Sequence, residues 1–423
     1  MIKKIILGIS LLFSSVIFAQ EGTASPYSFY GIGDVKYRGT HENKAMGGLG
    51  ILPDSIHLNL QNPASLASLK LTAFTVGATT KNTTFKNETQ KETASRTTFD
   101  YLALGFPISP KMGVSFGLMP YSSVGYKVDQ KTTTSLSTGE TANIDKRFTG
   151  EGGVNNVFLG LGYKITSKLS IGADFQYNFG RVETKSVGFV EDVHLGKREI
   201  NTSRYSGVAF NTGLIYQTKL NKKYDWISSL TYSPKSTLKS DNTGSVATIT
   251  YSANGSELVS DTKDYDPTRT DFELPAKYAL GTGIGVTKKW FVGAEITMQD
   301  KSKFLNRFDE ITNVEFEKSQ RYVIGGYFTP KFNSFTSYFD RVTYRAGFRY
   351  ENTGLVINNQ SIKDYGINAG FGFPIGKSLS NLNIGFEYGS KGTTSSNLIK
   401  ENYFSVYIGL SVNDLWFKRT KYE

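Results

Sequence analysis

Apolar and polar side chains alternate along several stretches of this chain with a period of two residues. In residues 169–180 the odd positions hold Leu, Ile, Ala, Phe, Tyr and Phe, whereas the even positions are small or polar. Residues 292–299 and 382–389 show the same division. Successive side chains of a β-strand point to opposite faces, and a membrane barrel turns apolar side chains to lipid and polar or small ones to its lumen. The pattern therefore predicts an all-β fold, a transmembrane antiparallel β-barrel.

The barrel is expected to have about fourteen strands, an even number, as single-chain outer-membrane barrels do. After the first twenty residues the chain has no stretch of eighteen apolar residues, and its mean hydropathy is −0.29, which excludes a helical membrane protein. The predicted strands lie near residues 69–80, 97–107, 111–128, 142–164, 168–190, 198–219, 224–251, 270–287, 289–303, 317–330, 340–352, 361–374, 380–390 and 400–412.

The links between these strands alternate in length, as expected where short periplasmic turns alternate with long extracellular loops. Short links are predicted at 108–110, 165–167, 220–223, 288 and 375–379, and long polar links at 81–96, 129–141, 252–269 and 304–316. If the first strand runs from the periplasm outwards, these short links all fall on the periplasmic side and the long links all fall on the extracellular side. The link at 331–339 falls on the short-link side but is longer than a tight turn.

Charged residues within the alternating strands show which face looks inward. Arg345 and Arg349 share one face of the predicted strand 340–352, opposite Val, Tyr, Ala and Phe. An Arg on the lipid face costs roughly 2–4 kcal/mol at the midplane, so both should face the lumen. There they would pair with Asp174, Glu295 or Glu387 or with the N-terminal segment, or one of them would bind a ligand carboxylate through its guanidinium.

Both ends of the chain differ from the barrel pattern. Residues 1–20 have two lysines, an apolar run and a small-residue end, the layout of a secretory signal peptide. Residues 21–68 are rich in Gly and turn signals and are expected to form a hatch packed inside the lumen. The barrel is expected at 69–412, followed by a basic periplasmic tail at 413–423.

An N-terminal piece ending in Asn62-Pro63-Ala64 and followed by fourteen strands resembles the FadL/TodX family of outer-membrane transporters for long-chain fatty acids and aromatic hydrocarbons. Further carriers of the resemblance are residues 150–155, 274–277 and 290–295. The resemblance implies a hatch and a hydrophobic pocket. It also implies sideways release of ligand into the bilayer at a kink in the third strand.

Pro120 lies in the predicted third strand, at the place where such a kink is expected. Proline cannot donate a ladder hydrogen bond, so it is kept out of central strands unless a bulge or a break is present. An ordinary bulge and a lateral opening are both consistent with this residue.

Composition removes several other classes of function. The chain has no Cys, which excludes thiolate metal sites, and its net charge of +11 is dispersed along the sequence, which does not indicate nucleic-acid binding. Its three histidines, His41, His57 and His194, lie outside the predicted strands. We therefore predict no catalytic residue, no metal and no cofactor.

Two functions follow from these observations. The first is an outer-membrane channel for uptake of a hydrophobic small molecule, such as a long-chain fatty acid, by a FadL-like lateral route. The second is a non-transporting FadL-like subunit of an outer-membrane secretion or assembly complex, which would need protein partners in the envelope. In both cases the chain is expected in the outer membrane, surrounded by lipid.

Overall fold

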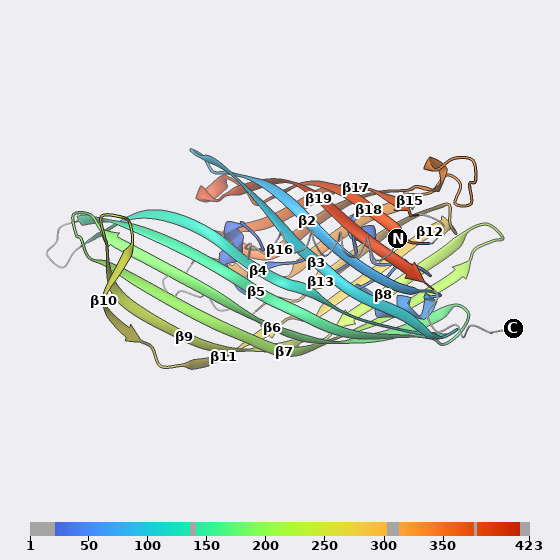
Figure 1. Cartoon of the computed structure of the whole chain (residues 1–423), viewed down its shortest axis with the longest axis horizontal. Helices are drawn as coiled ribbons and strands as arrows, with labels where there is room; N and C mark the ends of the chain where they lie inside the picture. The colour runs from blue at the N-terminus through green and yellow to red at the C-terminus, as the bar shows by residue number, and fades with distance from the viewer. Residues whose placement is uncertain (1–21, 136–140, 303–312, 376–378, 415–423) are drawn as a thin grey trace.

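The structure is a computed structural model, and it describes residues 22–135, 141–302, 313–375 and 379–414. The predicted signal peptide and residues 415–423 of the predicted tail lie outside these ranges. Within the described residues, fourteen antiparallel strands form one closed barrel (Figure 1). The first and last strands pair from Lys86 with Lys400 to Thr72 with Asp414, which closes the wall. The predicted fold class and strand number are confirmed.

Three of the fourteen strands consist of more than one segment: β8 and β9 form the seventh, β10 to β12 the eighth, and β14 and β15 the tenth. The segments are β2 (Thr72–Lys86), β3 (Lys91–Ser109), β4 (Met112–Ser135), β5 (Thr141–Lys164), β6 (Leu169–Val190), β7 (Gly196–Lys219), β8 (Asp225–Ser233), β9 (Ser236–Tyr251), β10 (Glu257–Asp264), β11 (Thr268–Leu274), β12 (Lys277–Val286), β13 (Trp290–Gln299), β14 (Val314–Phe316), β15 (Ser319–Phe328), β16 (Thr343–Ile357), β17 (Gln360–Pro374), β18 (Asn381–Lys391) and β19 (Lys400–Asp414). Short 3-10 turns follow β15, as η3 (Phe339–Arg341), and β18, as η4 (Ser395–Asn397).

Several predicted loops are largely strand. β2 and β3 extend through most of 81–96, β4 enters 129–141, and β10 occupies part of 252–269. These extensions are polar on both faces because they stand outside the bilayer, so they lack the apolar alternation on which the prediction relied. The break in the seventh strand falls at Pro234 and the two breaks in the eighth fall at Pro267 and Pro275, where the ladder would need an N–H that proline lacks.

Strand length differs strongly around the barrel. β4, β5 and β7 each have 24 residues, whereas β12 and β13 have 10. A tilted strand crosses a bilayer in about 9–11 residues, so the long strands must project beyond it. They project at the end opposite to Thr72 and Asp414. We call the end with Thr72 and Asp414 the short-turn end and the other the long-loop end.

The N-terminal segment, residues 22–71, lies inside this wall (Figure 1). It contains η1 (Pro26–Phe29), β1 (Asp34–Val35), α2 (His41–Lys44) and η2 (Pro63–Ser68). No helix within the described ranges is long and apolar enough to cross a membrane.

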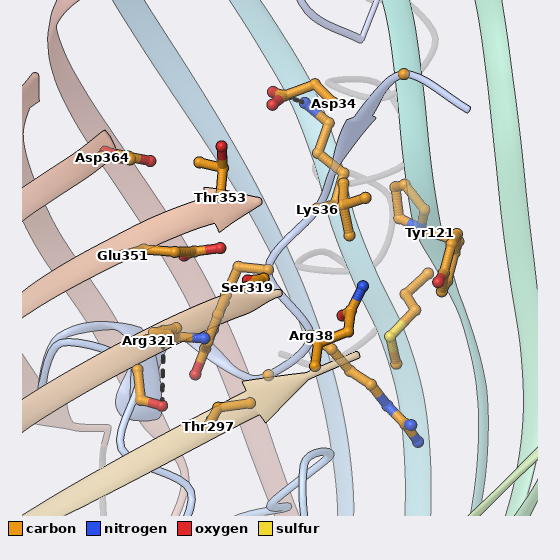
Figure 2. A pocket seen from close by; sticks show the side chains of 18 of the residues that line it. Asp34, Lys36, Arg38, Tyr121, Thr297, Ser319, Arg321, Glu351, Thr353 and Asp364 are labelled. Carbon is orange, nitrogen blue, oxygen red and sulfur yellow. Dashed lines mark hydrogen bonds and ion pairs between the residues drawn. The ribbon is translucent and has the colours of Figure 1, made fainter. Parts of the chain in front are cut away.

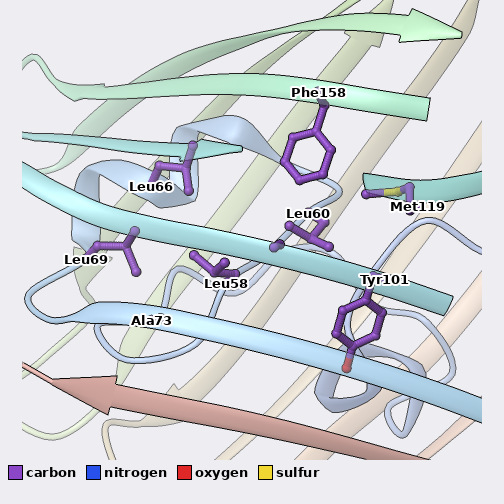
Figure 3. Packing of buried hydrophobic residues seen from close by; sticks show 9 residues of the cluster. Leu58, Leu60, Leu66, Leu69, Ala73, Tyr101, Met119 and Phe158 are labelled. Carbon is purple, nitrogen blue, oxygen red and sulfur yellow. The ribbon is translucent and has the colours of Figure 1, made fainter. Parts of the chain in front are cut away.

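Apolar side chains hold the segment to the wall. Leu58, Leu60 and Leu66 pack against Met119 and Phe158 of the barrel (Figure 3). Burying a Leu side chain contributes roughly 1.5–3 kcal/mol, so this cluster alone holds residues 58–66 of the segment firmly against the wall. The role of the segment as a hatch stays a prediction.

Candidate functional site

A cavity of about 470 Å³ lies between the N-terminal segment and the inner face of the barrel. Figure 2 shows Asp34, Lys36 and Arg38 of the N-terminal segment opposite Arg321 and Glu351 of β15 and β16. Leu58, Leu60 and Leu66 of the segment point elsewhere, into the cluster described above. The cavity lining combines many charged and polar groups, such as Asp34, Lys36 and Arg321, with a similar amount of apolar surface that includes Tyr37 and Tyr121.

Arg349 is the centre of a buried ion network on β16. Its guanidinium lies 3.0 Å from Asp364, 3.1 Å from Glu387 and 3.3 Å from Glu351, and it donates to the Tyr403 hydroxyl at 2.9 Å. The side chain is only 14 % exposed. A ligand carboxylate would have to compete with three carboxylates already in place.

Arg345, four residues earlier, has different partners. It donates to Asn383 at 3.0 Å, and Asn383 in turn donates to Glu42 of α2 at 2.8 Å. The two arginines thus face the lumen, but they do not converge on one position. Their predicted role in ligand binding stays a prediction.

Ion pairs and a hydrogen bond also tie the first part of the N-terminal segment, residues 25–36, to the barrel. Asp34 of β1 lies 2.8 Å from Lys391 of β18 and 3.8 Å from Lys36. Burial acts to raise the pKa of the Asp34 carboxyl, but the ammonium groups of Lys391 and Lys36 outweigh it and hold that pKa well below its usual range. Ser25 donates to the buried Glu401 of β19 at 2.5 Å. The segment is anchored by charge as well as by packing.

Arg38 forms a third connection, which the sequence did not single out. Its guanidinium lies 2.9 Å from Asp174, a predicted lumenal residue of β6. Asp174 is 3% exposed and also accepts hydrogen bonds from Gln176 at 2.5 Å and from Asn211 at 2.9 Å. Arg38 lies in an irregular stretch whose sequence has no periodicity, so nothing local predicts its position. The one indication in the sequence is Asp174, because a carboxylate facing the lumen needs a cation as its partner.

His57 and Asp54 form a pair at the short-turn end of the N-terminal segment, 2.8 Å apart. Burial lowers the pKa of His57, but Asp54 outweighs burial and raises it above its ordinary value; His57 holds the pKa of Asp54 at about 2. The stabilisation from His57 is thus complete below its unfolded pKa of about 6.5 and is lost as pH rises through the higher folded value. We expect tryptic cleavage of the segment to be slower at about pH 6 than at about pH 8.5 after correction for trypsin activity, and His57→Gln to remove the difference.

Asn62, Pro63 and Ala64 begin η2, where the Asn62 side chain accepts a hydrogen bond from the Ala64 N–H at 3.0 Å. Asn62 also donates to the Leu214 carbonyl of β7 at 3.4 Å. The triplet lies against inward-facing glycines of the wall, so it docks the segment on β6 and β7.

Pro120 lies where the wall is interrupted. The ladder between β3 and β4 runs from Ser109 with Met112 only as far as Leu102 with Leu118. The β4–β5 register then shifts between Pro120 and Ser122. On the inner side, β1 pairs with Ser122 and Ser123, and the Lys36 N–H donates to the Tyr121 carbonyl at 2.9 Å. The N-terminal segment thus occupies part of the β4 edge that β3 has left.

The three histidines are placed apart. His41 is buried, 2.7 Å from Asp100, and the Tyr101 and Tyr407 rings both lie 5.0 Å away. His194 lies in the turn between β6 and β7. In the part of the chain that the structure describes, no group of three His, Cys, Asp or Glu residues could hold a metal ion. The absence of catalysis and of a cofactor stays a prediction.

The fold is that of the FadL/TodX channels. Similar solved structures are the CymD monoaromatic hydrocarbon channel (TM-score 0.57, 13% identity, covering 93% of this chain and 100% of that one) and the Ralstonia pickettii toluene transporter TbuX (TM-score 0.55, 14% identity, 89% and 99%). The Pseudomonas putida toluene transporter TodX has a TM-score of 0.57 at 16% identity, covering 90% of this chain and 98% of that one. At these identities the likeness establishes a FadL-type outer-membrane barrel fold.

A family model gives the family of the chain. The model of the family described as BamG matches residues 1–423, so the chain belongs to the BamG family. A search of the curated proteins gives no match.

Proposed function

We propose that this chain is a non-transporting, FadL-shaped subunit of an outer-membrane secretion or assembly complex. The observation that carries the proposal is the charged lumen. The cavity is bordered by the Arg349 network, by the Asp34–Lys391 pair and by the Arg38–Asp174 pair. A barrel built to pass hydrocarbons needs an apolar surface along its route.

The energetics favour this reading over uptake of a hydrophobic compound. Burial of apolar surface contributes about 25 cal/mol per Å² only where the ligand meets an apolar environment. Against charged walls the ligand would displace water from ionic groups, and each imperfectly paired ion costs several kcal/mol. The apolar side chains of the N-terminal segment are already used in packing against the wall.

Purification from native membranes in mild detergent, with mass spectrometry of both proteins and small molecules, tests the proposal. We expect partner proteins in constant stoichiometry and no tightly bound fatty acid or hydrocarbon. A stoichiometric hydrophobic ligand without any protein partner would overturn the proposal.

Uptake of hydrophobic molecules is the second candidate function, and the interrupted β3–β4 seam favours it. A gap in the ladder at Pro120 is a plausible lateral exit, and solved barrels of the same fold carry the names of toluene transporters. In this case β1 would have to leave the β4 edge before a ligand could pass.

Because the chain has no native Cys, the seam can be tested by cross-linking. Extending the register above Leu102–Leu118 brings Phe99 opposite Tyr121. If the seam is an exit, a short bismaleimide link between Phe99→Cys and Tyr121→Cys should abolish uptake of a labelled fatty acid. The control is a link between Leu104→Cys and Phe116→Cys, which are already paired and should leave uptake unchanged. Equal uptake in both linked proteins would exclude this route.

A further inference from the structure

Basic residues mark the short-turn end of the barrel. Each of the fully described links there, at 110–111, 165–168, 220–224, 287–289 and 329–342, carries at least one Lys or Arg, including the pairs Lys222-Lys223 and Lys288-Lys289. Within these links the one carboxylate is Asp340, which already accepts a hydrogen bond from Ser334. We call this set of links the basic rim.

Among the described residues, no carboxylate forms an ion pair with a cation of the basic rim. At the long-loop end, several cations are paired: Lys185 and Arg198 meet Glu257 at 2.6 and 2.5 Å, and Arg147 meets Asp129 at 2.7 Å. An excess of one charge on one face attracts and orients a partner of the opposite charge.

One link of the rim is long, and it is folded. In 329–342 the Lys331 N–H donates to the Asp340 carbonyl at 2.8 Å, which closes the loop on itself. Ser334 accepts from the Ser337 N–H at 3.2 Å, and the Tyr338 hydroxyl donates to the Pro374 carbonyl at 3.0 Å. The loop is therefore held in one shape against the end of β17.

This folded loop presents aromatic side chains to solvent. Phe335 is fully exposed and Phe339 is 68 % exposed. Cations lie among the rings: Arg341 stacks 5.3 Å from the Tyr338 ring centroid, and Lys288 lies 4.9 Å from that of Phe332. Monomeric surfaces seldom hold a large aromatic ring wholly in water, whereas rigid aromatic and Arg side chains are typical anchors of protein interfaces.

The order of the loop favours a protein over lipid as its occupant. A fluid leaflet adapts to any side chain, so it does not require a fixed loop. A protein pocket gains affinity when the anchor is already held in its bound shape, because less conformational entropy is lost on binding. Charged groups interleaved with the rings would also be costly to bury in hydrocarbon.

We propose that the basic rim is the docking surface for an acidic periplasmic protein, with Phe335 as the anchor that enters an apolar pocket on that partner. This inference rests on the proposed function, since it names the face by which the barrel joins its complex. Charge complementarity steers the encounter, and the phenyl ring supplies the short-range contact.

The test uses the full chain in its native membrane. Phe335→Ser and the double variant Lys288→Glu/Lys289→Glu are compared with matched controls at the long-loop end, Tyr265→Ser and Lys263→Glu, which are also exposed. Each protein is purified in mild detergent, and its partners are quantified by mass spectrometry. We expect Phe335→Ser and the Lys pair to lose at least about ten-fold of one acidic partner, the size of an interface hot spot, and the controls to lose none. High salt should release the same partner from the unaltered chain.

The outcomes separate this inference from the proposed function. If the unaltered chain holds partners and every variant keeps them, the proposed docking surface is contradicted, whereas the proposed subunit role is still supported. If the unaltered chain holds no partner, both fail.

A second experiment tests whether lipid is the occupant. The variant Phe335→Trp is placed in vesicles with brominated acyl chains, and the quenching of its tryptophan fluorescence is compared with that of the unaltered chain. Added quenching would place the side chain in the bilayer and overturn the inference, whereas unchanged fluorescence supports it.

Discussion

Replacing Arg349 by Met should lower the free energy of unfolding by about 3–5 kcal/mol, because the change leaves buried carboxylates without their cation. Asp364, Glu387 and Glu351 all lie within 3.3 Å of this guanidinium. Met keeps most of the side-chain volume, so lost charge rather than a cavity dominates the effect. Urea unfolding in detergent, followed by the shift between folded and unfolded bands in gel electrophoresis, measures the change.

The matched control for this prediction is Arg269→Met. Arg269 pairs with Asp241 at 2.6 Å, but it is 69 % exposed, and an ion pair in water contributes little to stability. Adding Asp364→Asn to Arg349→Met should restore part of the lost stability, because Arg349 is the cation that pairs with Asp364 in the described residues and its loss leaves that carboxylate uncompensated. Equal losses for Arg349→Met and Arg269→Met would show that the lumenal network is not a structural element.

Under the proposed subunit role, the charged lumen would hold the N-terminal segment rather than pass a hydrocarbon. The same wall that could line a channel here holds the N-terminal segment by ion pairs and hydrogen bonds. Asp34, Arg38 and Glu42 of the segment each meet a partner on the wall, namely Lys391 of β18, Asp174 of β6 and Asn383 of β18. These contacts attach the segment to the wall at separate places along its length.

The barrel could be predicted from sequence because lipid imposes a strict rule on every crossing. Residues 382–389 alternate apolar and polar side chains, and they lie in β18 with Ile384, Phe386 and Tyr388 facing away from the lumen. The even number of strands and the parity of the links follow from the same constraint. The extensions of β2, β3 and β4 beyond the bilayer escaped prediction because water imposes no such alternation.

The ion contacts of the N-terminal segment could not be predicted. Asp34 and Lys391 lie 357 positions apart, and nothing local in either stretch indicates the other. Lys391 falls just past the predicted end of its strand at residue 390, where a charge looks like part of a loop. Pro120 was identified because proline has a direct consequence for a ladder, whereas the pairing of β1 with β4 depends on how an irregular segment folds in three dimensions.

Replacing Gly172 by Leu should displace the N-terminal segment from its seat while the barrel itself still forms. Gly172 of β6 pairs with Gly162 on one side and Gly213 on the other, so three glycines form one inward-facing floor. A Cβ on Gly172 would lie 2.5 Å from the Ala64 nitrogen, and backbone atoms cannot give way as a side-chain tip can. Overpacking of this kind costs about 1–3 kcal/mol or more, here concentrated on the docking of η2. Trypsin should then cut at Lys36, Arg38 or Lys44, and ion conductance through the lumen in planar bilayers should rise.

Gly188→Leu on the same strand is the matched control, because a Cβ there would meet its nearest atom at 3.6 Å, an ordinary contact. It should leave both cleavage and conductance unchanged. If Gly172→Leu gives the conductance and cleavage pattern of the unaltered chain, the segment is not seated on the glycine floor. If Gly172→Leu conducts ions yet still passes no hydrophobic compound, then removing the segment is not sufficient for transport. The charged wall would then be the barrier, as the proposed subunit role requires.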